Sequence, residues 1–126
     1  MIQIVTDPID PQRSYQLLQP GRAGSILLHF AVVKADGGSG QRSSAVEYQA
    51  EAGAEAELEE IVSILRAGWP ISDVLLQRRS GVLEVGEIIS LVAVCAEASA
   101  NSFAACQVGL ELLKKMKTIR KREVFI

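Results

Sequence analysis

The residues best suited to chemistry in this 126-residue sequence are six cationic side chains close to its end. They are Lys114, Lys115, Lys117, Arg120, Lys121 and Arg122. The whole chain holds 13 Lys plus Arg against 15 Asp plus Glu, so without this cluster the balance is 7 against 15. Such a cluster is typical of a nucleic-acid tail, of a solvated helix end, or of the wall of a pocket for a small anion.

Charge and composition separate these three possibilities. Lysines in the last turn of a helix are favoured by the helix dipole, by about 0.3–1 kcal/mol each, which accounts for residues 114–117 but not for residues 120–122. Nucleic-acid binding usually comes with a basic domain and interleaved aromatic residues. This chain has a net charge of −2 and only 5% aromatic residues. A pocket for a small anion, such as a phosphate-bearing substrate, is therefore favoured.

Other residue types that often carry chemistry are poorly placed for it. The stretch ADGGSGQR, residues 35–42, lacks the helix start and the Lys-Ser or Lys-Thr pair of a phosphate loop, and it predicts a hairpin loop. The one histidine, His29, lies in an apolar run and is expected in the core or at an interface rather than as a base. Cys95 and Cys106 are expected to be reduced core thiols. We expect no metal and no cofactor.

Hydrophobic patterning in the first half predicts a short strand over residues 2–5 and a helix that begins at Pro11 and ends at Pro20. The continuous apolar run at 24–34 predicts a strand in the interior of a sheet. A loop at 35–43 then leads to a returning strand at 44–51.

The second half contains the clearest helix, over about 52–67, because its apolar residues recur at helical spacing. Two strands, 73–79 and 87–96, follow it. A second long helix is predicted over 99–117, and a final short strand over 122–126. The predicted apolar stripe of that helix is formed by Phe103, Cys106, Leu110 and Leu113.

This order of elements mixes hairpins with helices, which favours a single α+β domain over residues 1–126 rather than a parallel, doubly wound sheet. No apolar run reaches the roughly 20 residues that span a bilayer, and no signal pattern is evident. We therefore expect a cytoplasmic protein without membrane contacts.

The motifs of the second half, taken in order, resemble the MoaE family, the large catalytic subunits of molybdopterin synthase. That family has a Gly-x-Leu-x-x-Gly-Asp/Glu hairpin, a strand and a helix that ends in Leu-Lys, and then a Lys-Arg/Lys-Glu motif seven residues on. The matching residues here are Gly81, Leu83, Gly86, Glu87, Leu113, Lys114, Lys121, Arg122 and Glu123. Upstream, GSILLHFAVVK and the Trp69-Pro70 turn also look like the family's pattern.

The resemblance implies a fold and an activity. The family fold is of the α/β-hammerhead type, with a mixed, largely antiparallel sheet and two to three packed helices. The enzyme inserts two sulfurs into cyclic pyranopterin monophosphate and so forms the molybdopterin dithiolene of molybdenum cofactor biosynthesis. The sulfur arrives as a thiocarboxylate on the C-terminal Gly-Gly of a small ubiquitin-like carrier. Two large subunits form the homodimer core of a heterotetramer.

Matched by position, Lys114 takes the place of the family's catalytic lysine. Lys121, and Lys34 in place of an arginine, are implied to bind the substrate, with Lys115 and Arg122 as further candidates. The family's His-Arg pair before the last helix falls on Ala98 and Ser99. Two hypotheses stay open: a sulfurtransferase, or a divergent, non-catalytic relative that keeps the fold and dimer and binds the carrier without turnover.

Overall fold

The computed structural model describes residues 1–35 and 43–125, in which three helices alternate with seven strands. In chain order the elements are β1 (Ile2–Val5), α1 (Pro11–Leu17), β2 (Ser25–Val32), β3 (Ser43–Ala50), α2 (Ala54–Gly68), β4 (Ile71–Arg79), β5 (Gly81–Glu84), β6 (Ile88–Ala96), α3 (Ser99–Lys114) and β7 (Ile119–Phe125). The predicted loop lies mostly at 36–42, outside the described residues.

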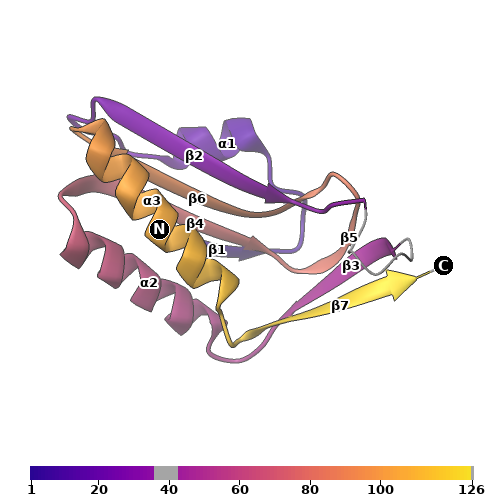
Figure 1. Cartoon of the computed structure of the whole chain (residues 1–126). Coiled ribbons are helices and arrows are strands. Elements are labelled where there is room, and N and C mark those ends of the chain that lie inside the picture. Colours follow the sequence, from indigo (N-terminus) through magenta and orange to yellow (C-terminus); the bar gives the residue numbers. More distant parts are fainter. Residues whose placement is uncertain (36–42, 126) are drawn as a thin grey trace.

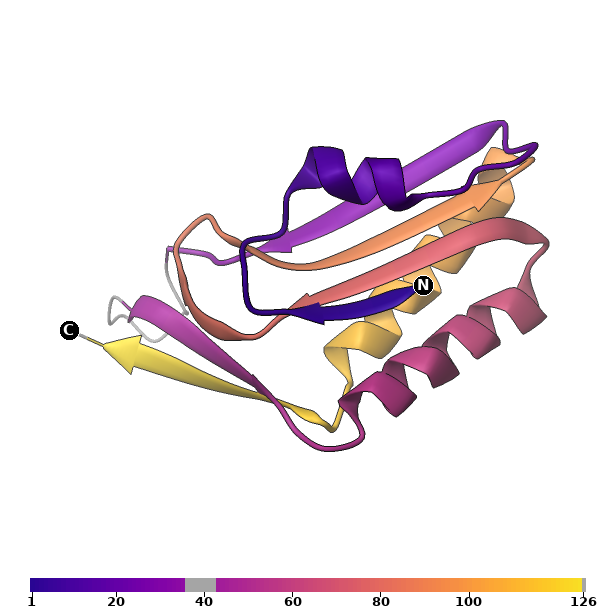
Figure 2. The ribbon, with the colours of Figure 1, turned by 180° about the vertical axis from the view of Figure 1, so that it is seen from behind.

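The strands form two sheets, a four-stranded one in the order β1-β4-β6-β2 and a three-stranded one in the order β5-β3-β7. Among the described strands, only β1 and β4 pair in parallel. The other pairs are antiparallel. Helices α2 and α3 lie side by side on one face of the four-stranded sheet, and α1 covers part of the other face (Figures 1 and 2). This confirms the predicted α+β class and its largely antiparallel sheet.

The core lies mainly between the α2–α3 layer and the sheet. Leu58 and Leu65 of α2 meet Val92 of β6 and Leu113 of α3 there. Gly109 is needed for this approach, because a Cβ atom at that position would lie 3.1 Å from the side chains of both Leu65 and Val92. A smaller apolar cluster on the opposite face packs under α1. These packed layers hold the end of α3 in a fixed position.

The three-stranded sheet sits at one end of the larger sheet. Along each of its strands, successive side chains point to opposite faces of the sheet. Arg120 and Arg122 lie two residues apart on β7 and so share a face; Arg120 forms an ion pair with Glu51, just after β3, and Arg122 with Glu47 of β3. Lys121, between them, therefore points to the other face. A cavity described below lies on that side.

Several boundaries differ from the prediction. Helix α3 ends at Lys114 rather than at residue 117, because the carboxylate of Glu57 accepts hydrogen bonds from the backbone N–H groups of Lys117 and Thr118 at 3.1 Å. The last strand begins at residue 119 rather than 122. Strand β5 was not predicted; its four residues depend on pairing with the distant β3.

Phe103 was predicted on the core stripe of α3, but its side chain is 61% exposed. The predicted spacing holds for Cys106 and Leu113, which are buried, while Phe103 lies on the outward side. Both cysteines are buried free thiols, as predicted.

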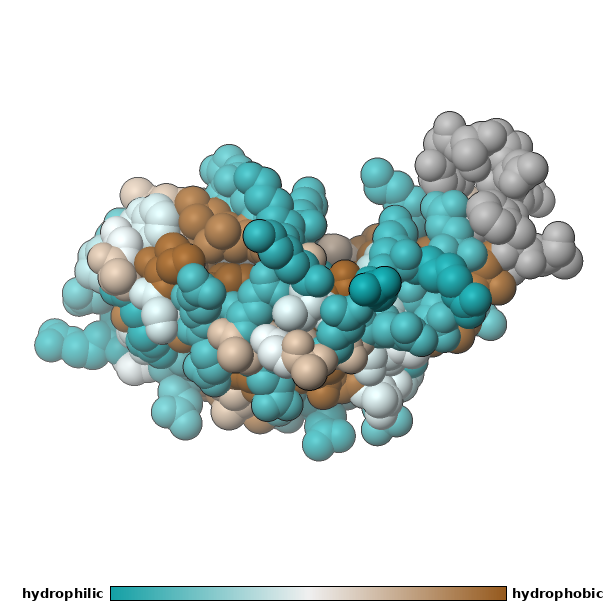
Figure 3. Space-filling view, turned by 90° about the horizontal axis from the view of Figure 1, so that it is seen from below, coloured by the Kyte–Doolittle hydropathy of each residue, from teal (hydrophilic) through white to brown (hydrophobic). Residues whose placement is uncertain are grey.

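The surface seen from below is mostly hydrophilic, with a hydrophobic patch at the end away from the three-stranded sheet (Figure 3). No helix in the described part of the chain is long and apolar enough to cross a membrane.

Candidate functional site: a cationic pocket at the end of the last helix

A pocket of about 660 Å³ lies beyond the last turn of α3, between the four-stranded sheet and the three-stranded sheet. Its walls come from the end of β2, the start of β6, the end of α3, and strands β3 and β7. The charged residues that line it are Lys34, Arg78, Lys114, Lys121 and Glu123. Among the described residues, four cationic side chains thus face one carboxylate, which makes the pocket attractive to anions.

Three predicted lysines come together here from distant parts of the chain. Lys34 follows β2, Lys114 is the last residue of α3, and Lys121 lies in β7. All three side chains are exposed, and no described residue forms an ion pair with any of them. Their charges are therefore available to a ligand.

Backbone contacts hold two of these lysines in place. Val33, just before Lys34, is fixed by two backbone hydrogen bonds. Its N–H donates to the carbonyl of Glu87 at 3.0 Å, and its carbonyl accepts from the N–H of Gly86 at 2.9 Å. The turn between Lys114 and Lys121 is held by Glu57 of α2, which also accepts a 2.6 Å hydrogen bond from the Thr118 hydroxyl. Helix α2 thus fixes the spacing between two pocket lysines without lining the pocket itself.

The network around Glu57 changes its acidity. Partial burial alone would raise the pKa of this carboxyl group. The hydrogen bonds from Thr118 and Lys117, with the nearby Lys117 charge, outweigh that effect and hold the pKa below its ordinary value. The turn is therefore stabilised by an ionised carboxylate.

Sequence reasoning missed Arg78, which lies in the pocket wall with only 7% of its surface exposed. Its guanidinium stands over the ring of Tyr48, 5.6 Å from the ring centroid. Strand alternation gives the signal that could have found it, because Val74 and Leu76 of the same strand face the helical core and Arg78 follows at the same spacing.

The two other predicted binding residues do not line the pocket. Lys115 is exposed just beyond α3, and Arg122 pairs with Glu47 on the opposite side of β7, at 2.9 Å. His29, expected in the core or at an interface, lines the pocket from β2 and is half-buried.

Ala98 and Ser99 stand at the beginning of α3, while Lys114 ends it. A helix of this length, 16 residues, separates its two ends by about 24 Å, at 1.5 Å per residue. In one chain, then, these two positions cannot contribute to the pocket.

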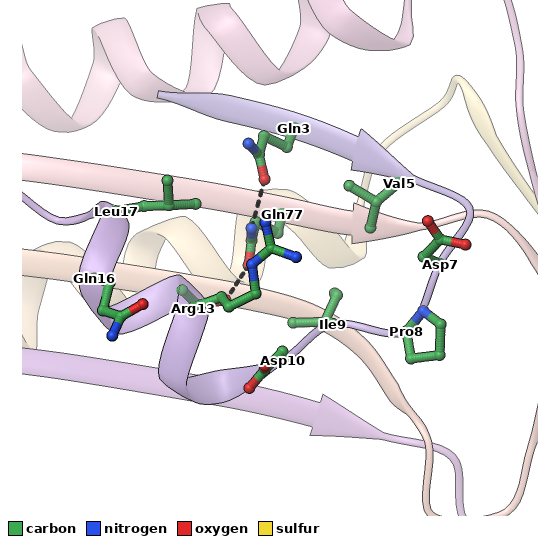
Figure 4. Close-up of a pocket in the computed structure, with 11 residues that line it drawn as sticks. Gln3, Val5, Asp7, Pro8, Ile9, Asp10, Arg13, Gln16, Leu17 and Gln77 are labelled. Atoms are coloured by element: carbon green, nitrogen blue, oxygen red, sulfur yellow. Dashed lines mark hydrogen bonds between the residues drawn. The ribbon is translucent and has the colours of Figure 1, made fainter.

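A second pocket, of about 670 Å³, lies under α1 on the opposite face of the sheet (Figure 4). It contains a hydrogen-bond chain in which Ser14 donates to Gln77 at 2.6 Å and Gln77 donates to Gln3 at 2.6 Å. Asp10, on its rim, caps α1 by accepting from the N–H of Gln12 at 3.0 Å. Its described charged lining residues are Asp7, Asp10 and Arg13, so it lacks the excess of cations found in the first pocket, which is the better candidate for an anion site.

The fold and the site together define an α+β protein with a cationic pocket suited to a small anionic ligand. The sequence model of the MoaE protein family matches residues 4–116. The chain therefore belongs to the MoaE family, as the motifs predicted.

Known relatives agree with this assignment. The molybdopterin synthase catalytic subunit of Pyrococcus abyssi is 31% identical over 126 residues, covering 98% of this chain and 84% of the relative. That of a Nostoc species is 29% identical over 118 residues, covering 92% of this chain and 71% of the relative.

Solved structures show the same fold. Molybdopterin synthase from Staphylococcus aureus superposes with a TM-score of 0.90 at 23% identity, covering 98% of this chain and 90% of the other. A chain in the complex of subunits 1 and 2 of molybdopterin-converting factor from Helicobacter pylori superposes with a TM-score of 0.79 at 10% identity, covering 98% and 88%.

Proposed function

We propose that this chain is the catalytic subunit of a molybdopterin synthase. It transfers sulfur from a thiocarboxylated carrier protein to cyclic pyranopterin monophosphate, which becomes the dithiolene of molybdopterin. The observation that carries the proposal is the convergence of Lys34, Lys114 and Lys121 on one pocket in a member of the MoaE family.

The chemistry of the pocket fits an anionic substrate that needs proton transfer. Opening of the cyclic phosphodiester leaves a phosphate group with added negative charge, which Lys121 and Lys34 are placed to hold. Lys114 is the residue that exchanges protons with the reacting pterin. We do not assign substrate binding to Lys115 or Arg122, because they lie outside the pocket.

The partner in this proposal is a small ubiquitin-like carrier whose C-terminal Gly-Gly enters the pocket. The family resemblance also supports a homodimer that binds one carrier at each end. In that assembly the second copy, rather than the first, would bring the start of its α3 helix toward this pocket. Support for a protein partner comes from the Helicobacter pylori neighbour, which was solved as a complex of two subunits.

One observation favours a second candidate function. The positions of the family's His-Arg pair hold Ala98 and Ser99, which carry no charge and are both exposed. A relative that binds the carrier and keeps the dimer, but does not turn over substrate, would tolerate this loss.

Reconstitution separates the two candidates. The purified chain is mixed with a thiocarboxylated carrier and the cyclic precursor, and molybdopterin is measured after oxidation to its fluorescent derivative. Carrier binding is measured in parallel by calorimetry. Product formation supports the synthase; carrier binding with no product supports the non-catalytic relative. Absence of both would contradict either proposal.

A further inference from the structure

Two adjacent buried arginines on β4 differ in their hydrogen bonding. Arg79 is 8% exposed, and its guanidinium donates to the carbonyl of Thr6 at 2.9 Å and to the carboxylate of Glu87 at 3.0 Å. Arg78 is 7% exposed, yet its Nε has no hydrogen-bond partner among the described residues. Because successive residues of a strand face opposite sides, Arg79 belongs to the far face and Arg78 to the pocket.

A buried cation without hydrogen-bond acceptors is costly. Burial lowers the pKa of Arg78, although Tyr48 acts in the opposite direction, and a guanidinium still stays charged at neutral pH. The contact with the Tyr48 ring offsets part of this cost, but a ring face accepts no conventional hydrogen bond from Nε. The described residues therefore leave this guanidinium without the acceptor that its burial calls for.

The surroundings of Arg78 indicate the kind of acceptor. Ser90, its cross-strand neighbour on β6, is buried and lines the same pocket, so it offers a hydroxyl group next to the guanidinium. Three lysines add their charge, and Glu123 is the one described carboxylate in the lining. A single carboxylate would neutralise only one of these cations, whereas a phosphate dianion neutralises two and presents several acceptor oxygens.

We propose that Arg78 and Ser90 form the inner wall of a phosphate subsite in this pocket, with the Arg78 guanidinium donating to a phosphoryl oxygen. Arg78 is thus a ligand-binding residue of the pocket, added to the three lysines. The assignment rests on the proposed function in that the phosphate is taken to be the substrate's, but the subsite itself can be tested without carrier or pterin.

The test is the affinity of the purified chain for inorganic phosphate at constant ionic strength, measured by phosphorus NMR titration and by the rise in melting temperature. Arg78→Met keeps the apolar stem and removes the guanidinium, while Arg78→Lys keeps the charge without the planar donor geometry. Arg122→Gln removes one charge from the outer side of β7 and serves as the control. The Gly-Gly dipeptide is titrated in the same way, to test whether Arg78 binds a carboxylate rather than a phosphate.

We expect the dissociation constant for phosphate to rise about tenfold or more in Arg78→Met, and by a smaller factor in Arg78→Lys. Arg122→Gln should change it by less than about twofold. Without phosphate, Arg78→Met should melt at the same temperature as the parent chain or higher, because an unpaired buried charge has been removed.

The proposal is overturned if Arg78→Met binds phosphate as tightly as the parent chain does, or if it melts at a lower temperature than the parent without phosphate. It is also overturned if Arg78→Met loses binding of Gly-Gly but keeps binding of phosphate. Failure of the proposed function looks different. In that case phosphate binding depends on Arg78, yet the reconstituted chain makes no molybdopterin.

Discussion

At the scale of single residues, side-chain direction along β7 separates pocket cations from surface cations. Lys121 lines the pocket, whereas Arg120 and Arg122 on either side of it are paired with glutamates on the other face. The dense basic cluster of the sequence therefore contains cations that line the pocket and cations that lie outside it. Of the three consecutive residues here, Lys121 is the one available to a ligand in the pocket.

Neutralising Lys121 should weaken anion binding far more than neutralising its neighbour. Lys121→Gln removes a charge that faces the ligand, so we expect the dissociation constant for phosphate to rise about tenfold. Arg122→Gln removes a charge that is already paired with Glu47 and should change the constant by less than about twofold. Titration of both variants checks this; equal effects would mean that only the overall charge matters.

The two cysteines should be inert in the folded protein. Burial raises the pKa of Cys106 to about 11. Burial, together with the charge of Asp73, raises that of Cys95. Since the thiolate is the reactive form, both should react at pH 8 at least about 100-fold more slowly than in denaturant. An aromatic disulfide reagent measures this, with the guanidinium-unfolded chain as the reference; fast reaction of either native thiol would contradict the expectation.

At the scale of elements, the position of the pocket depends on contacts between helices and strands that are distant in sequence. Helix α2 contributes no lining residue, but its Glu57 anchors the turn that leads from Lys114 to β7. The spacing of the lysines is thus a property of the α2–α3–β7 arrangement rather than of the basic segment alone.

Removing this anchor should destabilise the chain in a pH-dependent way. We expect Glu57→Gln to lower the free energy of unfolding by about 1 kcal/mol at pH 7, a modest value because the carboxylate is partly exposed. The folded pKa of Glu57 is lowered, so its contribution is fully present above the pKa of an unfolded glutamate, about 4.3. It is lost as the pH falls through the lower, folded pKa.

Urea unfolding at several pH values, with the exposed Glu60→Gln of the same helix as control, measures this difference. Equal destabilisation by the two variants at pH 7 would show that the anchor has no specific role. The same conclusion would follow if the difference in unfolding free energy between Glu57→Gln and the parent chain did not shrink in acid.

Periodicity was enough to predict most elements, because α2, α3 and the buried strands have clear repeats of apolar residues. It could not predict β5 or the division into two sheets, since both depend on pairing with β3 across long stretches of sequence. The end of α3 was placed too late for a similar reason: its stop signal, Glu57, lies in another helix.

For the site, the family motifs led to Lys34, Lys114 and Lys121, which the fold brings to one pocket. Arg78 was missed because no motif marks it and because Arg79, next to it, has the same type and a similar burial. Strand alternation places the two on opposite faces of β4, and their hydrogen bonds in the folded chain distinguish them further. The motif match alone also gave no indication that Arg122 would be paired outside the pocket.

At the scale of the whole molecule, the proposed dimer would bring the start of a partner's α3 toward the pocket. Ala98 and Ser99 lie at the far end of α3 from the pocket, and the exposed Phe103 lies one turn further along the same helix. An exposed phenylalanine in this region is consistent with a covering partner surface.

Light scattering should therefore give twice the chain mass, and addition of carrier should raise this to a complex of two large and two small subunits. Phe103→Glu should lower the dimer fraction by placing a charge in the interface, while the exposed Glu60→Gln should leave it unchanged. A monomer at high concentration would contradict the assembly.

In the proposed function, the pocket at the end of α3 carries out sulfur transfer through Lys114. The most direct test compares Lys114→Ala with Lys115→Ala in the reconstituted reaction, because these neighbours have the same charge and only Lys114 lines the pocket. We predict that Lys114→Ala loses activity by about 100-fold or more while still binding the carrier. Lys115→Ala should stay within about threefold of the parent chain, since an exposed charge outside the pocket acts only through the screened field. Equal activity of the two variants would contradict the claim.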